Sequence, residues 1–125
     1  MGRITMSEKF FFDTYAFFEL IQGNPAYEKY RAVQPITTIV NLAELSFGIR
    51  REHPIEESEK YVKKYSQMLT DIEISDVIKA AEFKVNNRHL SLVDAIGYCV
   101  AQRIGVKFLT GDKEFSHMKN VEFVQ

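Results

Sequence analysis

Four acidic side chains stand at points of the chain where their carboxylates could meet. Each lies where a strand is expected to end, where a helix begins, or on a helix face that is otherwise mostly apolar; they are Asp13, Glu44, Asp94 and Asp112. Carboxylate oxygens are the ligands that hard divalent cations prefer. The pattern therefore predicts one acidic site for a metal ion, built from segments far apart in the sequence.

Alternating strand-like and helix-like segments are expected to position these acids. The expected strands are Phe10–Phe12, Pro35–Thr38, Asp71–Ile74, Val106–Leu109 and Val121–Val124. The expected helices are Thr14–Ile21, Tyr27–Val33, Val40–Arg51, Ile55–Leu69, Asp76–Asn86 with Ser75 as its cap, and a segment from Ser91 to Ile104 that stops at Gly105. This order predicts an α/β fold with a central, mostly parallel sheet flanked by helices on both faces.

Length and composition favour a single domain spanning residues 1–125. With 46% apolar side chains, ten Phe and six Tyr, the chain is long enough for one packed core and too short for two. A net charge of −1 and a pI near 6.3 exclude a globally basic surface for non-specific nucleic-acid binding. Positive charge is concentrated on one helical stretch, which is either a solvated face or a local polyanion site: Arg50, Arg51, Lys60, Lys63 and Lys64.

Cysteine content and the start of the chain indicate the compartment. Cys99 is the only cysteine, so it cannot form an internal disulfide and is expected to be a small core residue. Residues 1–10 carry charges and no long apolar run, so neither a secretory signal nor a membrane span is expected, and the expected location is the cytoplasm. Met6 is an alternative start to Met1, because the residues before it add no periodic pattern.

The expected topology gives each acid a route to one edge of the sheet, because ligands of parallel sheets gather at the carboxyl ends of the strands. Asp13 follows the first strand and Asp112 follows a later one. Ser91 and Asp94 have the spacing of a capping box, which places Asp94 in the first turn of its helix. Glu44 lies in the middle of a helix on a partly apolar face, where an unpaired carboxylate should be protonated, find a cation or bind metal.

Each acid also has a purely structural explanation. Asp13 could cap the next helix, Asp94 could serve only its capping box, and Asp112 suits a Gly-Asp turn. A cap, a box, a turn and a half-buried acid have no structural reason to lie at one edge of one sheet. Taken together, the four positions therefore favour the metal site.

Other site chemistries lack their residues. His53, His89 and His117 show no i to i+4 pairing and there is no cysteine cluster, so a zinc site is not indicated. No G-x-S-x-G sequence is present for a serine nucleophile.

Four stretches of the chain resemble the signature regions of PIN-domain nucleases. They are FFDT around Asp13, NLAEL around Glu44 with Gly48 beyond it, LSLVDA around Asp94, and LTGDKEF around Asp112. Within that superfamily the size of the chain looks most like the VapC toxins of prokaryotic toxin–antitoxin pairs. The resemblance implies a PIN-like three-layer sandwich and a Mg²⁺- or Mn²⁺-dependent endoribonuclease, usually a homodimer, that a small antitoxin protein inhibits.

The resemblance also implies roles for individual positions. The acids that match the catalytic, metal-holding quartet are Asp13, Glu44, Asp94 and Asp112, and those that match auxiliary positions are Thr14, Thr110 and Glu114. Two residues depart from the family pattern: Tyr15 is bulkier than the residue often found there, and Glu114 stands where Asp is common. These departures affect the substrate entrance and any fifth ligand rather than the four acids.

The expected function is metal-dependent cleavage of single-stranded RNA by the toxin of a toxin–antitoxin pair. Asp13, Asp94 and Asp112 are the expected principal ligands, and Glu44 is a ligand or orients a water molecule. Mutual repulsion should raise the pKa values of the acids, so metal binding should strengthen as pH rises. Two alternatives stay open: a PIN-like nuclease of RNA processing outside a toxin pair, and a non-catalytic PIN-like binding module.

Aromatic residues near the first acid could stack on RNA bases or belong to the core; they are Tyr15, Phe17 and Phe18. With Tyr27, Tyr30, Tyr61 and Tyr65 they predict apolar surface that a small domain cannot bury alone. A homodimer or a bound antitoxin would cover that surface.

Overall fold

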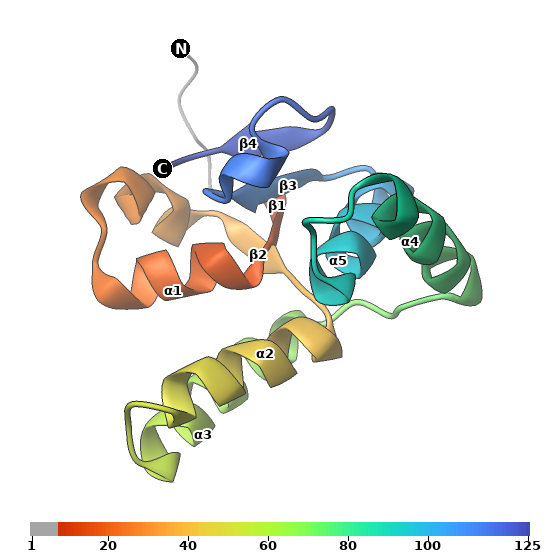
Figure 1. The fold of residues 1–125 in the computed structure, drawn as a ribbon. Coiled ribbons are helices and arrows are strands. Elements are labelled where there is room, and N and C mark those ends of the chain that lie inside the picture. The colour runs from red at the N-terminus through yellow and green to blue at the C-terminus, as the bar shows by residue number, and fades with distance from the viewer. Residues whose placement is uncertain (1–7) are drawn as a thin grey trace.

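A four-stranded parallel sheet forms the centre of the protein in the computed structural model, which describes residues 8–125 (Figure 1). The strands are β1 (Lys9–Phe12), β2 (Gln34–Ile36), β3 (Lys107–Thr110) and β4 (Val121–Phe123). Their order is β2-β1-β3-β4, and every neighbouring pair is parallel. The central strands β1 and β3 are largely apolar, as strands covered on both faces must be. The alternative start at Met6 lies outside the described residues.

Helices cover both faces of the sheet, and the predicted fold class is confirmed (Figure 1). On one side lie α1 (Thr14–Gln22) and the 3₁₀ helix η1 (Pro25–Ala32), and on the other lie α4 (Ile74–Asn86) and α5 (Leu92–Ile104). Between them in sequence, α2 (Ile39–Arg50) and α3 (Ile55–Tyr65) form a helix pair that extends away from the sheet. Two short 3₁₀ turns complete the chain, η2 (Ser66–Met68) and η3 (Lys113–Phe115).

Alternation of side chains along β1 divides the core into two layers. Phe10 and Phe12 pack on the side of α1, where Phe12 meets Phe17. Phe11 points to the opposite side and stacks on Phe108 of β3, with ring centroids 5.6 Å apart. A Cβ at Gly97 of α5 would come within 2.9 Å of the Phe11 ring, so this helix lies directly on the strand. The buried aromatic layers fix the carboxyl ends of β1 and β3.

The predicted strand at residues 71–74 is wrong, and so is the predicted cap. This segment is a loop that leads into α4, whose N-cap is Glu73 rather than Ser75, in a capping box with Asp76. Arg103 of α5 donates to both oxygens of Asp76 at 3.0 Å and to the carbonyl of Asp71 at 2.9 Å. A cation from a distant helix thus stabilises the loop and the helix start.

The expectation of aromatic surface around the first helices is also wrong. Most of these rings are buried in the core, namely Tyr27, Tyr30, Tyr65 and Phe17, and Tyr61 is partly buried against it. The Tyr30 hydroxyl donates to the carboxylate of Glu122 at 2.6 Å, and the Tyr27 hydroxyl to the carbonyl of Val124. Because these hydroxyls reach the last strand, the rings can be buried without unpaired polar atoms.

Smaller differences concern element ends. The predicted helix over residues 55–69 stops at Tyr65 and continues as a 3₁₀ turn, and residues 25–32 form a 3₁₀ helix. Cys99 is buried, as predicted. Among residues 8–125, the helices are too short or too polar to cross a lipid bilayer.

Candidate functional site

All four predicted acids line one cavity at the carboxyl-end edge of the sheet. This acid cavity has a volume of about 410 Å³ and is lined by Asp13, Thr14, Tyr15, Phe18, Glu44, Phe47, Gly48, Arg51, Asp94 and Asp112. Asp13 comes from the end of β1, Glu44 from α2, Asp94 from the start of α5, and Asp112 from the loop after β3. Segments almost a hundred positions apart in sequence therefore present carboxylates to the same space.

Asp13 lies at the base of the acid cavity with only 2% of its surface exposed. One carboxylate oxygen accepts a hydrogen bond from the backbone N–H of Thr14 at 2.9 Å, and the other accepts from the Thr110 hydroxyl at 2.8 Å. Burial, then the charge of Asp94 and less strongly that of Glu44, raises the pKa of Asp13 to about 8, although both hydrogen bonds oppose the shift. At neutral pH this position favours a proton or a cation.

Thr110 links Asp13 to Asp112. Its hydroxyl donates to Asp13 and accepts from the backbone N–H of Asp112 at 3.1 Å. Asp112 in turn accepts from the backbone N–H of Glu114 at 3.0 Å and caps η3. The Glu114 side chain faces a different pocket, which it shares with His117, so it is not brought to the acid cavity.

Asp94 and Glu44 approach the acid cavity from two helices. Asp94 accepts from the backbone N–H of Ser91 at 3.0 Å, which confirms the predicted capping box. Burial raises the pKa of Asp94; the Ser91 hydrogen bonds oppose this and the charge of Asp112 adds to it. Burial likewise raises the pKa of Glu44. A hydrogen bond with Thr14 lowers this pKa, and the charge of Asp94 raises it further. The same two causes, desolvation and mutual repulsion, act on both carboxyl groups.

Asn41 supports the site although no role was predicted for it. It is fully buried; its side-chain N–H donates to the Thr14 hydroxyl at 3.1 Å, and its side-chain oxygen accepts from the Thr38 hydroxyl at 2.7 Å. Thr14 is thereby fixed between Asp13 and Glu44. Asn41 begins the NLAEL stretch, but nothing in the sequence shows that this Asn, one helical turn before Glu44, is buried rather than exposed.

Two glycines leave room for the rings that wall the acid cavity. A Cβ at Gly111 would collide with the Tyr15 ring and with the carbonyl of Val124, so the loop after β3 can lie against Tyr15 only because this residue is glycine. A Cβ at Gly48 would collide with the ring of Phe18. Tyr15 remains partly exposed at the rim, while Phe18 is half-buried.

The donor set of the acid cavity fits a hard divalent cation, because its candidate ligands are carboxylate and hydroxyl oxygens. In the positions that residues 8–125 take, no three Asp, Glu, His or Cys side chains form a group that could hold an ion. Mg²⁺ is commonly held through one or two carboxylates and keeps several of its water molecules. Asp13 and one neighbouring carboxylate would supply that number of ligands. A site with three or more carboxylate ligands would require the side chains of the acids to rotate towards one another.

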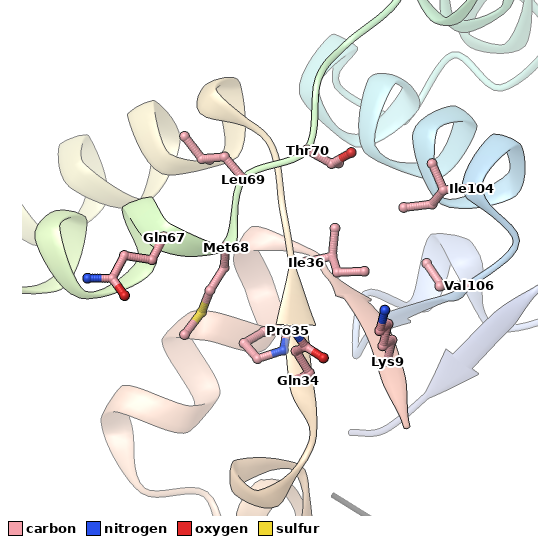
Figure 2. A pocket seen from close by; sticks show the side chains of 10 residues that line it. All are labelled: Lys9, Gln34, Pro35, Ile36, Gln67, Met68, Leu69, Thr70, Ile104 and Val106. Carbon is pink, nitrogen blue, oxygen red and sulfur yellow. The ribbon is translucent and has the colours of Figure 1, made fainter. Parts of the chain in front are cut away.

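A second cavity of similar size lies at the opposite edge of the sheet, near the starts of β1 and β2. Its volume is about 390 Å³. Figure 2 shows Met68 and Leu69 on one side of β2, and Ile104 and Val106 on the other. Among the described residues of this lining, Lys9 is the only charged one and none is a carboxylate. The two edges thus differ in charge rather than in size.

The order of the strands and the acids at their carboxyl ends define an α/β protein with an acidic cavity at the usual ligand-binding edge. The chain belongs to the PIN domain family, whose model matches residues 10–121. No curated protein sequence matches it significantly.

Several solved structures are similar to this chain over nearly its whole length. The M. tuberculosis toxin VapC20, described as cleaving the sarcin–ricin loop, has a TM-score of 0.74 at 18% identity and covers 93% of this chain and 99% of its own. A toxin–antitoxin complex from Klebsiella pneumoniae has a TM-score of 0.72 at 19% identity, covering 90% and 95%. VapBC-1 from nontypeable Haemophilus influenzae has a TM-score of 0.70 at 14% identity, covering 92% and 96%. At these identities the likeness establishes the fold.

Proposed function

We propose that this protein is a metal-dependent endoribonuclease that cleaves single-stranded RNA, and that it is the toxin of a toxin–antitoxin pair. The observation that carries the proposal is the acid cavity, where four carboxylates from separate segments meet and the pKa of buried Asp13 is raised to about 8. Membership of the PIN domain family and the similarity to VapC and VapBC structures support it.

We assign the metal ligands to Asp13, Asp94 and Asp112, with Mg²⁺ or Mn²⁺ as the ion and Glu44 as a further ligand or as the residue that orients a water molecule. A bound ion would supply a Lewis acid for the phosphate and lower the pKa of a water molecule. Without a cation, the carboxylates would repel the phosphodiester that the site has to bind.

Auxiliary residues hold these acids in place. Thr110 orients Asp13 and Asp112 through its hydroxyl, and Thr14 contributes its N–H to Asp13 and its hydroxyl to the network of Asn41. Glu114 contributes through its backbone N–H, and it lines a different pocket from the acid cavity.

The decisive experiment incubates the purified protein, free of any co-purifying inhibitor, with labelled single-stranded RNAs and Mg²⁺ or Mn²⁺. We expect cleavage that is lost with EDTA and in an Asp94→Asn variant. If the intact protein binds metal through Asp94 but cleaves no RNA, the non-catalytic binding module replaces the nuclease. If it cleaves RNA but its expression leaves cell growth unaffected, the RNA-processing alternative replaces the toxin.

The homodimer that we propose uses the outer face of α4. This helix exposes an apolar stripe of Ile74, Val77, Ile78 and Val85; Ile74 is 76% and Val85 68% exposed. Lys79 and Glu82 lie along one flank of the stripe. If a second copy packs antiparallel about a two-fold axis, each Lys79 comes opposite the other copy's Glu82, as a self-complementary interface requires.

The interface is tested by the mass of the particle in solution. Sedimentation equilibrium at tens of micromolar should give a dimer for the natural chain and a monomer for Ile78→Glu. The matched control is Ile55→Glu, which places the same charge on an exposed isoleucine of α3 and should leave the dimer intact. A monomeric natural chain would disprove the dimer, and a dimeric Ile78→Glu variant would disprove its placement on α4.

The antitoxin and the cytoplasmic location remain proposals that rest on the toxin–antitoxin assignment. Structures described as toxin–antitoxin and VapBC complexes are similar to this chain. Co-expression with the small protein encoded beside it should restore growth and suppress RNA cleavage by the purified complex. Growth arrest that persists in the presence of that protein would remove it as the antitoxin.

A further inference from the structure

One face of α2 runs from the acids of the site to a cation. Four residues on this face have the spacing i, i+3, i+4 and i+7: Glu44, Phe47, Gly48 and Arg51, the last of which caps the helix. All four residues line the acid cavity. Arg51 lies about 10 Å from Glu44 along the helix axis, given a rise of about 1.5 Å per residue.

Phe47 occupies the middle of this face and is 66% exposed. The Arg51 guanidinium carbon lies 5.4 Å from the centroid of its ring. The ring does not belong to either core layer, so the packing of the chain does not explain it. An aromatic ring beside a cation is the arrangement on which proteins stack the bases of single-stranded nucleic acids.

Of the described residues that line the acid cavity, Arg51 is the only cation. Within residues 8–125 it forms no ion pair with a carboxylate, so its charge is available to a ligand. Its neighbour Arg50 differs: it donates to the carbonyl of His53 at 3.2 Å and lines a separate groove between α2 and α3. Two adjacent arginines thus serve different surfaces.

We propose that Phe47 and Arg51 form a nucleotide-binding platform for the RNA substrate. The base of the nucleotide next to the cleaved bond stacks on the Phe47 ring, and the Arg51 guanidinium binds the phosphate of that nucleotide. The inference rests on the proposed ribonuclease function and adds to it how an acidic site holds a polyanion. RNA is favoured over a protein partner because the platform is continuous with the acid cavity and offers one cation and one ring.

The experiment measures binding and cleavage separately. Binding of a fluorescent single-stranded RNA is measured by anisotropy with Mg²⁺ in an Asp94→Asn background, so that the RNA stays intact. Phe47→Ala and Arg51→Gln should each weaken binding about tenfold, since stacking and phosphate contacts contribute at that level. Phe47→Tyr keeps an aromatic ring and should bind RNA as tightly as the parent. The matched control is Arg50→Gln, which should bind RNA within about twofold of its parent because its side chain faces another groove.

Two further measurements identify the contact that each residue makes. Removing one phosphate contact from a single strand should reduce the slope of log affinity against log salt by about 0.7 in Arg51→Gln and leave it unchanged in Phe47→Ala. An RNA with one abasic nucleotide beside the cleavage site should bind the parent and Phe47→Ala equally. In the active background, both variants should raise KM more than they lower kcat.

The outcomes separate this inference from the function on which it rests. If the natural chain neither cleaves nor binds single-stranded RNA, the proposed function fails. If it cleaves RNA while Phe47→Ala and Arg51→Gln behave like Arg50→Gln, the platform is disproved and the function stands. If both variants keep RNA binding but lose a protein partner, this face of α2 is a protein-docking surface and the inference is wrong.

Discussion

Two buried aspartates of this chain have pKa values shifted in opposite directions. Asp13 and Asp76 have 2% and 1% of their surfaces exposed, and each lies at the start of a helix. Asp76 faces Arg103: its burial raises its pKa, but the Arg103 and Glu73 hydrogen bonds and the Arg103 charge lower it below the ordinary value. Asp13 faces carboxylates, and its pKa rises to about 8.

We expect this difference to separate an acid with a structural role from a proposed metal ligand. The pair of Asp76 and Arg103 holds the start of α4 against the end of α5 and needs no external partner. Asp13 has hydrogen bonds but no ion pair with a cation among residues 8–125, so its burial carries an electrostatic cost that a metal ion would remove. Burial alone therefore does not distinguish the two aspartates; the charges that surround each carboxylate do.

The largest effect should separate the two aspartates by activity. Asp13→Asn and Asp94→Asn should each lower RNA cleavage by about 1,000-fold, because a lost metal ligand removes several kcal/mol of transition-state stabilisation. Asp76→Asn should retain activity within about twofold per folded molecule, since its side chain lies outside the acid cavity. Single-turnover cleavage with Mn²⁺ measures the activity of all three variants. Equal losses of activity would contradict the expected difference between Asp13 and Asp76.

The free energy of unfolding should depend on Asp76, the aspartate whose loss is expected to leave activity nearly unchanged. Asp76→Asn should lower the free energy of unfolding by about 2 kcal/mol, because Arg103 loses its buried partner but keeps water and Glu73. Urea denaturation followed by circular dichroism gives the value. Asp71→Asn removes an exposed carboxylate nearby and should change stability by less than about 0.5 kcal/mol. An unchanged midpoint in Asp76→Asn would refute the structural role.

Removal of the Asp13 charge should stabilise the metal-free protein. The pKa of Asp13 is raised on folding, so its contribution to stability is fully present below its ordinary pKa near 4 and is lost as pH rises towards 8. Asp13→Asn should therefore raise the free energy of unfolding by about 1–2 kcal/mol at pH 7.5, and by much less at pH 4. Thermal melts in EDTA measure the difference, which should reverse when Mn²⁺ is added. A variant less stable than the natural chain at pH 7.5 would contradict this assignment.

Metal affinity should depend on pH at the same site. A cation must displace the proton that Asp13 holds with a pKa of about 8, so binding releases a proton and strengthens with rising pH. From pH 6 to pH 8, Mn²⁺ affinity should increase about tenfold or more by isothermal titration. RNA cleavage should fall towards acid pH for the same reason, and a flat profile from pH 5 to pH 8 would be inconsistent with acidic ligands of raised pKa.

The smallest effect is expected at Glu114. Its side chain lies in another pocket, so Glu114→Gln should alter RNA cleavage by less than about threefold at saturating metal. Steady-state kinetics over a range of Mn²⁺ concentrations provide the test. A large loss that excess metal reverses would show that Glu114 turns into the acid cavity as a ligand.

Much of the fold could be predicted because local signals agreed with the tertiary structure. Phe10–Phe12 is an apolar run that ends at Asp13, and Val106–Leu109 is a mostly apolar run shortly before Asp112; both lie in central strands. The strand predicted at residues 71–74 failed for a physical reason. Its alternation of polar and apolar residues is only four residues long, and the loop is stabilised by Arg103, which lies about thirty positions away in sequence.

The sequence predicted the four acids and two of their supports, Thr14 and Thr110. It did not predict what Asn41 and Phe47 do, because a buried amide and an exposed ring on one helix look alike until the neighbouring elements are placed. Arg51 was visible only as one of several cations on a helical stretch. The buried tyrosines failed for a related reason: their hydroxyls find partners on β4, a strand that local sequence cannot connect to them.

The order of the strands has a consequence for synthesis of the protein on the ribosome. β3 is the inner neighbour of β1, yet it is made about a hundred residues later, so the sheet lacks one of its two central strands until Thr110 has been added. Asp112 follows β3, so a nascent chain cannot assemble the acid cavity before that point. A ribosome that stalls earlier in the message would release a polypeptide that lacks Asp112 and therefore lacks the assembled acid cavity.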